Sequence, residues 1–335
     1  MRLAVTVLVL AMGAPTLVPA QDANVLHSVE YIEARLRAPE LHILASEYAR
    51  QLEGDRSRKV TLAGVDGEPD MDVHWKPVAR GATGFNNEPR YELAAYRLQQ
   101  FFLDEAEYVV PTTVLRAMAL EEYSQIRTVE GPTLQNTNSV LFLLSYWLEN
   151  LAVDTVDPFS QTMFDMNPRY AWAWGNVNLL THLINHRDAN HGNILVSLVD
   201  GNSRIFAVDN DVAFRSRVSD QGDRWRRLVV DRLPDETVAR LRAVTEDELH
   251  EALGVLAEFT VEDGLLQPAE RGPNLRPDRG VRVTQERVQF GLTEREIRDV
   301  HERIRDLLRD VDRGRITTFP RPVVTPDGDN LFESF

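Results

Sequence analysis

Apolar residues recur every three to four positions in several stretches of the chain, the spacing that places them on one face of a helix. The clearest stretch covers residues 88–103, with Pro89 near its start. Thr293 and Glu296 have the spacing of a capping box, which predicts a helix from there to about Asp312. The same periodicity predicts the remaining helices, at residues 24–53 (interrupted by Pro39), 168–185, 234–243 and 246–259.

Short runs of β-branched and aliphatic residues lie between these helices and predict strands. They cover residues 59–64, 71–79, 109–115, 140–146, 194–199 and 204–208. The Pro-, Gly- and Arg-rich stretch 267–280 and the tail from Pro320 show neither period, so we expect irregular structure there. The mixture of helices and strands indicates an α+β fold.

The last two predicted strands are joined by residues 200–203, Asp-Gly-Asn-Ser, which favour a turn. We expect a tight turn at the central Gly201-Asn202 pair, which by counting outward places Ile194 opposite Asp209. The hairpin would therefore return Asp209 beside Asn193 and Asp188, although 21 residues separate the two aspartates.

Two carboxylates and one carboxamide would then converge at one end of the hairpin. Hard oxygen ligands of this kind suit Mg²⁺ that holds a polyphosphate, with one carboxylate left to receive a proton. Asp209 follows a run that we expect to be buried, and a buried carboxylate needs a partner. A metal ion is a natural partner for it.

The composition bears on the binding partners, the cellular compartment and the candidate site residues. The chain has 335 residues and a formal net charge of −15, with 52 acidic against 37 basic residues, which argues against DNA or RNA as a partner. It contains no cysteine and so forms no disulfides, which fits a bacterial envelope better than an animal secretory pathway. Only Lys59 and Lys76 among the 37 basic residues are lysines, so Lys76, in a predicted strand, is a candidate for ammonium chemistry.

The first 20 residues have the pattern of a signal peptide. Arg2 precedes a short apolar run, and small residues up to Ala20 form a cleavage site, which predicts a mature chain that starts at Gln21. The apolar run is too short to span a bilayer. We therefore expect a bacterial protein that is exported, periplasmic or secreted, with no membrane span in the mature chain.

The run His186-Arg187-Asp188, followed by Asn193 and the hairpin to Asp209, resembles the catalytic loop and metal-binding segment of the protein-kinase-like phosphotransferase superfamily. Residues 186–195 are also similar to the H-x-D-x-x-x-x-N-I-L run of aminoglycoside and choline phosphotransferases. Lys76-Pro77, the helix with Glu92 and the strand that follows it resemble the small lobe of secreted and phosphoinositide-type kinases. Together these motifs span roughly residues 59–214, about half of the chain.

This resemblance implies a bilobal α+β fold, with an antiparallel-sheet small lobe and a mainly helical large lobe. For this chain it predicts five parts: a signal peptide at residues 1–20, a helical N-terminal extension at 21–57, a small lobe at 58–146, a large lobe at 147–319 and an irregular tail at 320–335.

The resemblance also implies an exported kinase that uses ATP with Mg²⁺ or Mn²⁺. Asp188 would orient and deprotonate the acceptor hydroxyl, and Asn193 and Asp209 would hold the metal. Lys76, positioned by Glu92, would neutralise the phosphates. The acceptor stays open among protein, glycan, lipid and small molecule.

The chain departs from the family pattern at two points. It has no G-x-G-x-x-G motif for the phosphates, so Gly64 and Gly67, or Gly81 and Gly84, would have to serve. Asp211 stands where relatives usually carry a glycine, which makes Asp211 an alternative or outer ligand.

Several alternatives stay open. Within the same fold, the chain could be a nucleotide-binding pseudokinase or an enzyme that transfers AMP. His182, His186 and His191 cluster within ten residues, and the first two stand four apart, which is compatible with a zinc-dependent hydrolase. The competing interpretation is a core role for His182 and a hydrogen bond from His186 that braces the loop of Asp188. A non-catalytic envelope interaction protein is the remaining alternative.

Overall fold

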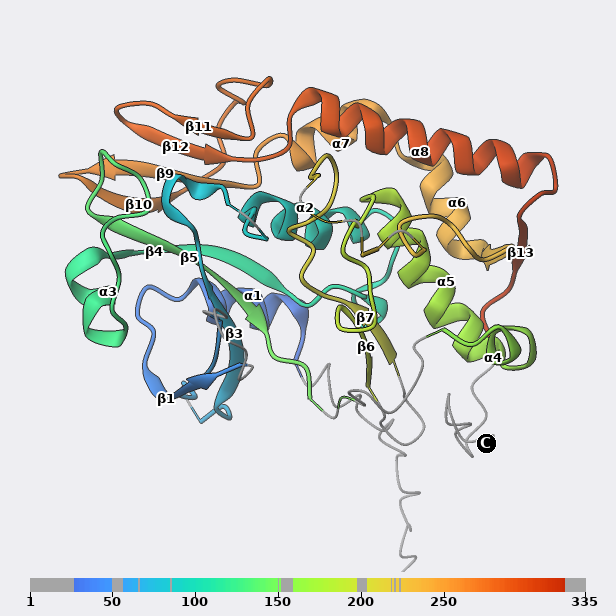
Figure 1. Ribbon diagram of the computed structural model, residues 1–335, viewed down its shortest axis with the longest axis horizontal. Helices are drawn as coiled ribbons and strands as arrows, with labels where there is room; N and C mark the ends of the chain where they lie inside the picture. The colour runs from blue at the N-terminus through green and yellow to red at the C-terminus, as the bar shows by residue number, and fades with distance from the viewer. Residues whose placement is uncertain are drawn as a thin grey trace, which may run out of the picture.

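The computed structural model describes residues 27–49, 57–65, 67–84, 86–149, 151, 159–197, 204–217, 219, 221–222 and 224–322. These form an α+β structure with two larger antiparallel sheets and a set of helices (Figure 1). The predicted signal peptide and the predicted turn at Gly201-Asn202 lie outside the described residues. Among the described residues, no helix is long and apolar enough to cross a membrane.

The larger sheet is antiparallel, with the strand order β1-β2-β3-β5-β4. Its strands are β1 (Ile43–Tyr48), β2 (Arg58–Leu62), β3 (Met71–Pro77), β4 (Thr113–Ala119) and β5 (Ser139–Tyr146). Three helices accompany it: α1 (Val29–Arg37), α2 (Pro89–Gln99) and α3 (Leu120–Ile126). Short 3-10 turns occur at Arg80–Ala82 and Glu105–Glu107.

The two faces of this sheet belong to two different hydrophobic cores. Alternating side chains such as Val73 and Trp75 pack with Ile32 of α1 in the smaller core. Leu141 and Leu143, which point the other way, join the larger core that contains α2 and most of the second half of the chain. The sheet therefore has one face toward α1 and α3, and the opposite face toward the body of the molecule.

The prediction of helix across residues 24–53 is wrong in its second half. Helix α1 ends at Arg37, because Ala38 precedes Pro39 and adopts a non-helical backbone. Residues 43–48 form strand β1 instead, paired with β2 from Ile43 opposite Leu62 to Tyr48 opposite Arg58. Five of the six side chains of β1 are exposed, so backbone pairing with β2 holds this edge strand, not a buried helical face.

The strand predicted at 109–115 begins later, at Thr113. The side chain of Gln99 takes the backbone bonds that Val109 and Val110 would use in a strand: Gln99 Oε1 accepts from both amides, and Gln99 Nε2 donates to the Val110 carbonyl. Pro111 has no amide to donate, so the ladder starts only beyond it.

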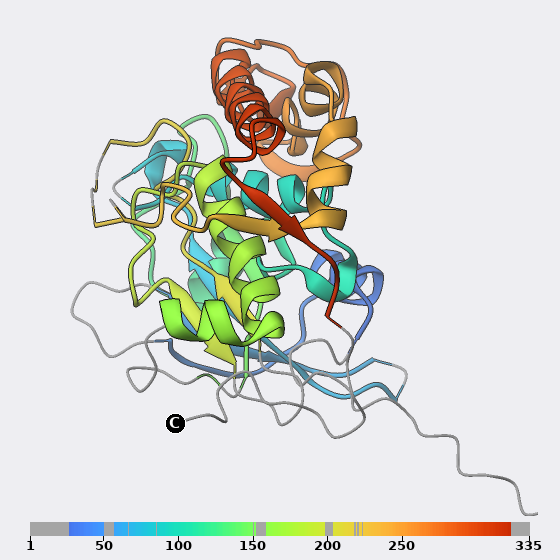
Figure 2. The same ribbon diagram turned by 90° about the vertical axis from the view of Figure 1, so that its right-hand side faces the viewer.

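The second half of the chain is arranged around α5 (Pro168–Leu183), which is buried along most of its length and lies at the centre of Figure 2. The other helices here are α4 (Gln161–Met166), α6 (Asp235–Ala243), α7 (Glu246–Leu253) and α8 (Glu294–Asp312). The predicted capping box of α8 is present between Thr293 and Glu296. Two short strands, β8 (Arg232–Pro234) and β13 (Thr317–Phe319), pair in parallel beside α5 (Figure 2).

A four-stranded antiparallel sheet was not predicted from the sequence. It has the order β10-β9-β12-β11 and consists of β9 (Ala257–Glu262), β10 (Leu265–Ala269), β11 (Val281–Val283) and β12 (Arg287–Phe290). The prediction of helix up to residue 259 is therefore wrong beyond Leu253, and the predicted loop at 267–280 begins only after β10. Asp263 and Gly264 both have positive φ, as a tight two-residue hairpin requires.

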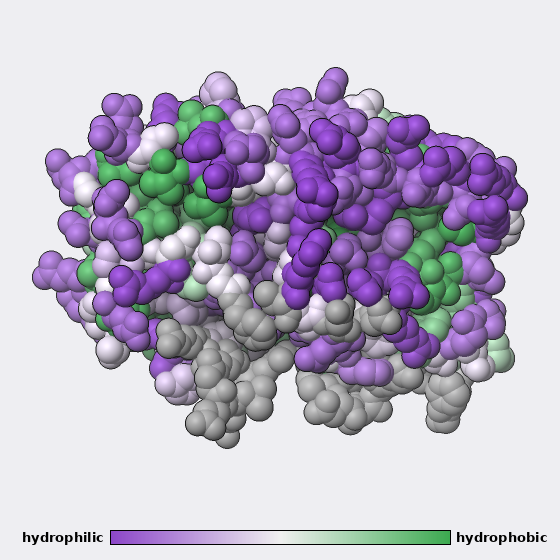
Figure 3. Space-filling model, turned by 45° about the horizontal axis from the view of Figure 1, so that its top comes forward, coloured by the Kyte–Doolittle hydropathy of each residue, from purple (hydrophilic) through white to green (hydrophobic). Residues whose placement is uncertain are grey.

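The surface is mainly hydrophilic on the face shown in Figure 3, as the net charge of −15 leads one to expect. The large apolar side chains that remain exposed are dispersed over the fold: Leu44, Tyr48, Val65, Met166, Leu275 and Val283. Single exposed apolar side chains are normal on a folded protein.

Candidate functional site

Lys76 lies at the end of β3, opposite Leu143 of β5, and so on the sheet face that points into the larger core. Its ammonium group contacts two aspartates that follow β7 (Arg204–Ala207): Nζ lies 2.6 Å from Oδ1 of Asp209 and 2.9 Å from Oδ2 of Asp211. Glu92 of α2 is the third carboxylate, with Oε1 at 3.9 Å from Nζ. The structure thus brings three of the candidate site residues, Lys76, Glu92 and Asp209, into one cluster with Asp211.

Glu92 is placed by the first turn of α2, which begins at Pro89. Its side chain is buried, and its Oε2 accepts a hydrogen bond of 3.3 Å from Asn210 Nδ2. The same turn of α2 is tied to the start of α8, because Arg90 donates to both carboxylate oxygens of Glu296, at 2.6 and 3.0 Å. Tyr91 also donates to Glu296. Helix α2 therefore presents Glu92 from a braced position.

The aspartates are presented by the segment that leaves the two-stranded hairpin of β6 (Ile194–Ser197) and β7. The predicted pairing of Ile194 with Asp209 is wrong, because Ile194 pairs with Ala207. Ser197 pairs with Arg204, so the register of the hairpin is two residues away from the predicted one. Asp209 consequently lies beyond the ladder, with a positive φ of 55°.

Asp188 and Asn193 form a second group. Asn193 Nδ2 donates to the carboxylate Oδ2 of Asp188 at 2.9 Å and to its carbonyl at 2.8 Å. The other carboxylate oxygen, Oδ1, accepts a hydrogen bond of 2.7 Å from the hydroxyl of Ser219. The two groups are joined through the backbone, since the amide of Val208 donates to the carbonyl of Asn193. Asn193, a predicted metal ligand, thus positions Asp188 in this structure.

His186 braces both groups. Its Nε2 lies 3.3 Å from the carbonyl of Val208 and must donate, while its Nδ1 accepts from the amide of Asp188. This pattern requires the neutral ring with the proton on Nε2. Burial lowers the pKa of His186, in agreement with the neutral form. The bracing role considered for His186 is therefore present.

The zinc alternative is not supported by the arrangement of the histidines. Among the described residues, the one group of metal-binding side chains with oxygen or nitrogen atoms close enough to share an ion consists of Glu92, Asp209 and Asp211. His182 is half-buried, its partial desolvation lowers its pKa, and its Nδ1 has no hydrogen-bond partner.

The ligand atoms of the three carboxylates lie within 4.8 Å of one another. Carboxylate oxygens suit hard ions such as Mg²⁺ and Mn²⁺ better than they suit softer ions. The Lys76 ammonium now neutralises part of their charge, so it stands in for a cation at this place. The chemistry of the cluster therefore fits a divalent metal, and Asp211, the last residue of the Asp-Asn-Asp run, is one of the three side chains that could hold it.

Burial raises the pKa of Glu92 to about 8; the charge of Lys76 opposes this shift, and the charges of Asp211 and Asp209 add to it. Burial likewise raises the pKa of Asp211 to about 6. Burial lowers the pKa of Lys76, but the charges of Asp209 and Asp211 outweigh it, so the net pKa of Lys76 lies well above its ordinary value. Lys76 thus stays charged, and burial favours the protonated form of Glu92 more than that of Asp211.

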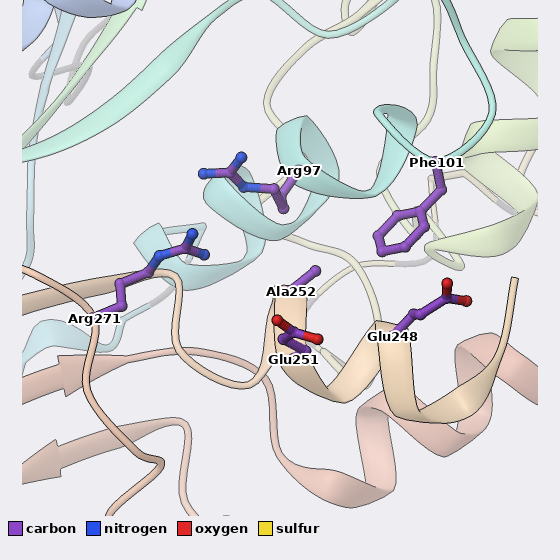
Figure 4. Close-up of a pocket in the computed structure, with 6 residues that line it drawn as sticks. All are labelled: Arg97, Phe101, Glu248, Glu251, Ala252 and Arg271. Carbon is purple, nitrogen blue, oxygen red and sulfur yellow. The ribbon is translucent and has the colours of Figure 1, made fainter.

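A separate pocket adjoins the end of α2 and contains none of these residues (Figure 4). Arg97 and Phe101 line it from α2 and the turn after α2. Glu248, Glu251 and Ala252 line it from α7, with Arg271 beside them.

No protein-family model matches the chain, and no curated protein matches it. Functional inference therefore rests on the chemistry of the site itself.

Proposed function

We propose that the chain is an ATP- and divalent-metal-dependent phosphotransferase of the protein-kinase-like type, acting on a hydroxyl acceptor. The observation that carries the proposal is the meeting of Lys76 with Glu92, Asp209 and Asp211 in one cluster, with Asp188 held nearby by Asn193. Residues of the same types perform phosphoryl transfer in protein kinases, where a strand lysine pairs with a helix glutamate.

The arrangement of elements supports this proposal. Lys76 lies on the third strand of an antiparallel five-stranded sheet, and Glu92 lies on the next helix along the chain. Protein kinases carry the corresponding lysine on their third strand. Asp188 precedes Asn193 by five residues, and a hairpin separates both from Asp209. The order of the residues along the chain is the order that such an enzyme requires.

Each side chain then has a defined task. Lys76 would bind the phosphate oxygens of ATP through its permanent positive charge. Asp209 and Asp211 would hold a divalent ion, which supplies the charge that neutralises the phosphates. Glu92, the carboxyl farthest from Nζ in the present cluster, would remain as the partner of Lys76 when the two aspartates turn to the ion.

Asp188 is the candidate base. Its carboxylate already accepts a hydrogen bond from a hydroxyl group, that of Ser219, at 2.7 Å. An acceptor hydroxyl in the same position would be oriented for attack and would lose its proton to an oxygen of Asp188. Asn193 holds the other oxygen and so prevents the carboxylate from turning away.

We also infer from the N-terminal pattern that the protein is exported, to the periplasm or beyond. The acceptor stays open among protein, glycan, lipid and small molecule. A pseudokinase that binds nucleotide and an enzyme that transfers AMP would share most of the same residues, so the test must separate binding from transfer.

The first experiment measures thermal stabilisation of the purified protein by ATP, ADP and AMP, each with and without Mg²⁺ or Mn²⁺. A ligand at about 100 times its dissociation constant adds about 2.7 kcal/mol to the unfolding free energy, a shift that is readily seen.

We expect stabilisation by ATP with metal, and we expect this stabilisation to be lost in Lys76→Met. Lys59→Met is the matched control, since Lys59 is the other lysine and pairs with Asp72 at 2.7 Å outside the cluster. Equal behaviour of the two variants, or no response to any nucleotide, would refute the proposal.

A further inference from the structure

Ser219 places a hydroxyl group on the carboxylate of Asp188. Its Oγ lies 2.7 Å from Oδ1 of Asp188, within the distance over which a general base takes a proton. Oδ2 of Asp188 is occupied by Asn193, so Oδ1 is the oxygen that faces the incoming hydroxyl. Ser219 therefore stands where the acceptor of a phosphoryl group would stand.

The position of Ser219 is set by contacts between its segment and the loop of Asp188. Arg187 Nε donates to the carbonyl of Ser219 at 3.0 Å, and the amide of Gly222 donates to the carbonyl of Arg187 at 2.7 Å. The two backbones approach so closely that a Cβ on Gly222 would lie 2.4 Å from the carbonyl oxygen of His186. Two hydrogen bonds and this close backbone approach thus hold the segment of Ser219 against the loop of Asp188.

The hydroxyl also meets the steric requirement of an acceptor. Ser219 is half-buried, so the residue that carries this hydroxyl is not enclosed in the core. Its remaining contact is a weak bond of 3.3 Å from the amide of Gln221, which leaves a lone pair of Oγ for attack. The preceding serine of the segment, Ser216, shows no such contact with Asp188; its amide bonds to Ala213.

We propose that Ser219 is phosphorylated by the chain's own site, in an intramolecular reaction with ATP. This inference rests on the proposed function. Oγ of Ser219 attacks the γ-phosphorus of ATP, a new O–P bond forms, and the bond from that phosphorus to the β,γ-bridging oxygen breaks to release ADP. The proton of the hydroxyl passes to Oδ1 of Asp188 and then to solvent.

The modification would change the site that made it. A phosphoserine carries about −1.5 to −2 charges at pH 7, and it would stand against the carboxylate of Asp188. Like-charge repulsion would drive the modified side chain away from the base. The phosphorylated Oγ has no proton left to transfer, and the displaced side chain would leave Asp188 accessible to a second hydroxyl.

The test is to incubate the full mature protein with ATP and Mg²⁺ or Mn²⁺ and to locate phosphate by peptide mass spectrometry. We expect phosphate at Ser219 in the wild type and in Ser216→Ala, and loss of that phosphate in Ser219→Ala and Asp188→Asn. The rate should not change with protein concentration, because the donor site and the acceptor belong to one chain. Mixing wild type with Asp188→Asn should leave Ser219 of the variant unmodified.

The other outcomes separate this inference from the proposed function. If the wild type phosphorylates other hydroxyls of the chain or an added serine peptide, while Ser219 stays unmodified, the inference is wrong and the phosphotransferase stands. A concentration-dependent rate would overturn the intramolecular step. Reduced transfer to the peptide in Ser219→Ala, without phosphate at Ser219 in the wild type, would make Ser219 a positioning residue. No transfer to any hydroxyl would overturn both proposals.

Discussion

Nζ of Lys76 lies 2.6 Å from Oδ1 of Asp209, although 133 residues separate the two in the sequence. The contact joins the inner face of the five-stranded sheet to the segment that follows β7. Asp211 and Glu92 surround the same ammonium group, so three carboxylates share one positive charge. The cluster therefore holds more acidic groups than a simple ion pair, and we expect each of its members to affect stability or binding.

Removal of the ammonium should destabilise the protein strongly. Lys76→Met leaves the carboxylates facing one another without a cation, and loss of one partner of a buried ion pair costs about 3–5 kcal/mol. Lys59→Met should cost about 1 kcal/mol or less, because the pair of Lys59 with Asp72 is partly exposed. Urea unfolding measures both values. Mg²⁺ should raise the stability of Lys76→Met more than that of the wild type, since an ion can replace the missing charge; no such difference would argue against a metal among these carboxylates.

Asp209→Asn should separate metal binding from folding. Asp211 still neutralises Lys76 in this variant, and the side chain of Asp209 is itself 39% exposed, so the unfolding free energy should change by about 1 kcal/mol or less. The stabilisation by ATP with Mg²⁺ should disappear, because a ligand oxygen is replaced. Asp72→Asn is the matched control, since Asp72 also pairs with a lysine outside the cluster. Retained nucleotide stabilisation in Asp209→Asn would remove Asp209 from the site.

The free energy of unfolding should fall as the pH rises and Glu92 loses its proton. Its pKa is about 8 in the folded chain against an ordinary value of 4.5, so the folded state holds a proton that the unfolded state has released. The stabilising contribution is complete below pH 4.5 and is lost as the pH rises through about 8. Asp211 has a pKa of about 6, so it loses its proton, and its own stabilising contribution, at a lower pH than Glu92 does.

The measurement is the unfolding free energy of wild type and Glu92→Gln between about pH 6 and about pH 9. We expect the wild type to lose stability over this range and the variant to lose less, because glutamine stays neutral throughout. The raised pKa of Lys76 does not interfere, since the ordinary lysine value is already 10.5 and its loss begins above that. Parallel curves for the two proteins would show that Glu92 is ionised in the folded state.

Local sequence patterns were sufficient to predict the strand that carries Lys76 and the helix that carries Glu92. The alternation in β3 and the apolar stripe of α2 are properties of a few neighbouring residues, and both elements are present. The capping box of α8 is equally local, and it is also present. In each of these cases a local preference agrees with the tertiary environment.

Features that depend on distant partners could not be predicted in this way. Strand β1 is stabilised by pairing with β2, and its own residues also fit a helical period. The register of β6 and β7 differs by two residues from the one counted outward from the expected turn, because local turn preferences alone do not fix the pairing of two strands. Ser219 lies 31 residues beyond Asp188, outside any helix or strand, so no periodic signal indicates its contact with the carboxylate.

The brace behind Glu92 should matter for both stability and binding. Arg90 and Glu296 form a buried bidentate pair, and Glu296 has a lowered pKa because Arg90 outweighs the effect of its burial. Arg90→Ala should cost about 3–5 kcal/mol, since Glu296 loses its counter-charge. Arg240→Ala, which removes an exposed pair with Asp104, should cost about 1 kcal/mol or less. Nucleotide stabilisation should weaken only in Arg90→Ala, where α2 can shift; equal costs for the two variants would show that the brace is not buried in solution.

The substitution Asp188→Asn chooses between a catalyst and a mere nucleotide binder. Asparagine keeps the size of the side chain and an oxygen that accepts a hydrogen bond, so the contact with Asn193 or Ser219 can persist, but it cannot take up a proton. Asp188 is not one of the three carboxylates that surround Lys76, so thermal stabilisation by ATP with metal should stay near that of the wild type. Phosphoryl transfer should fall by at least about a hundredfold, the usual contribution of a general base. Incorporation of γ-phosphate into the protein itself is the practical assay, because it needs no knowledge of the acceptor.

Equal rates in wild type and Asp188→Asn would rule out Asp188 as the base. Nucleotide binding by the wild type without transfer to any hydroxyl would instead identify a pseudokinase.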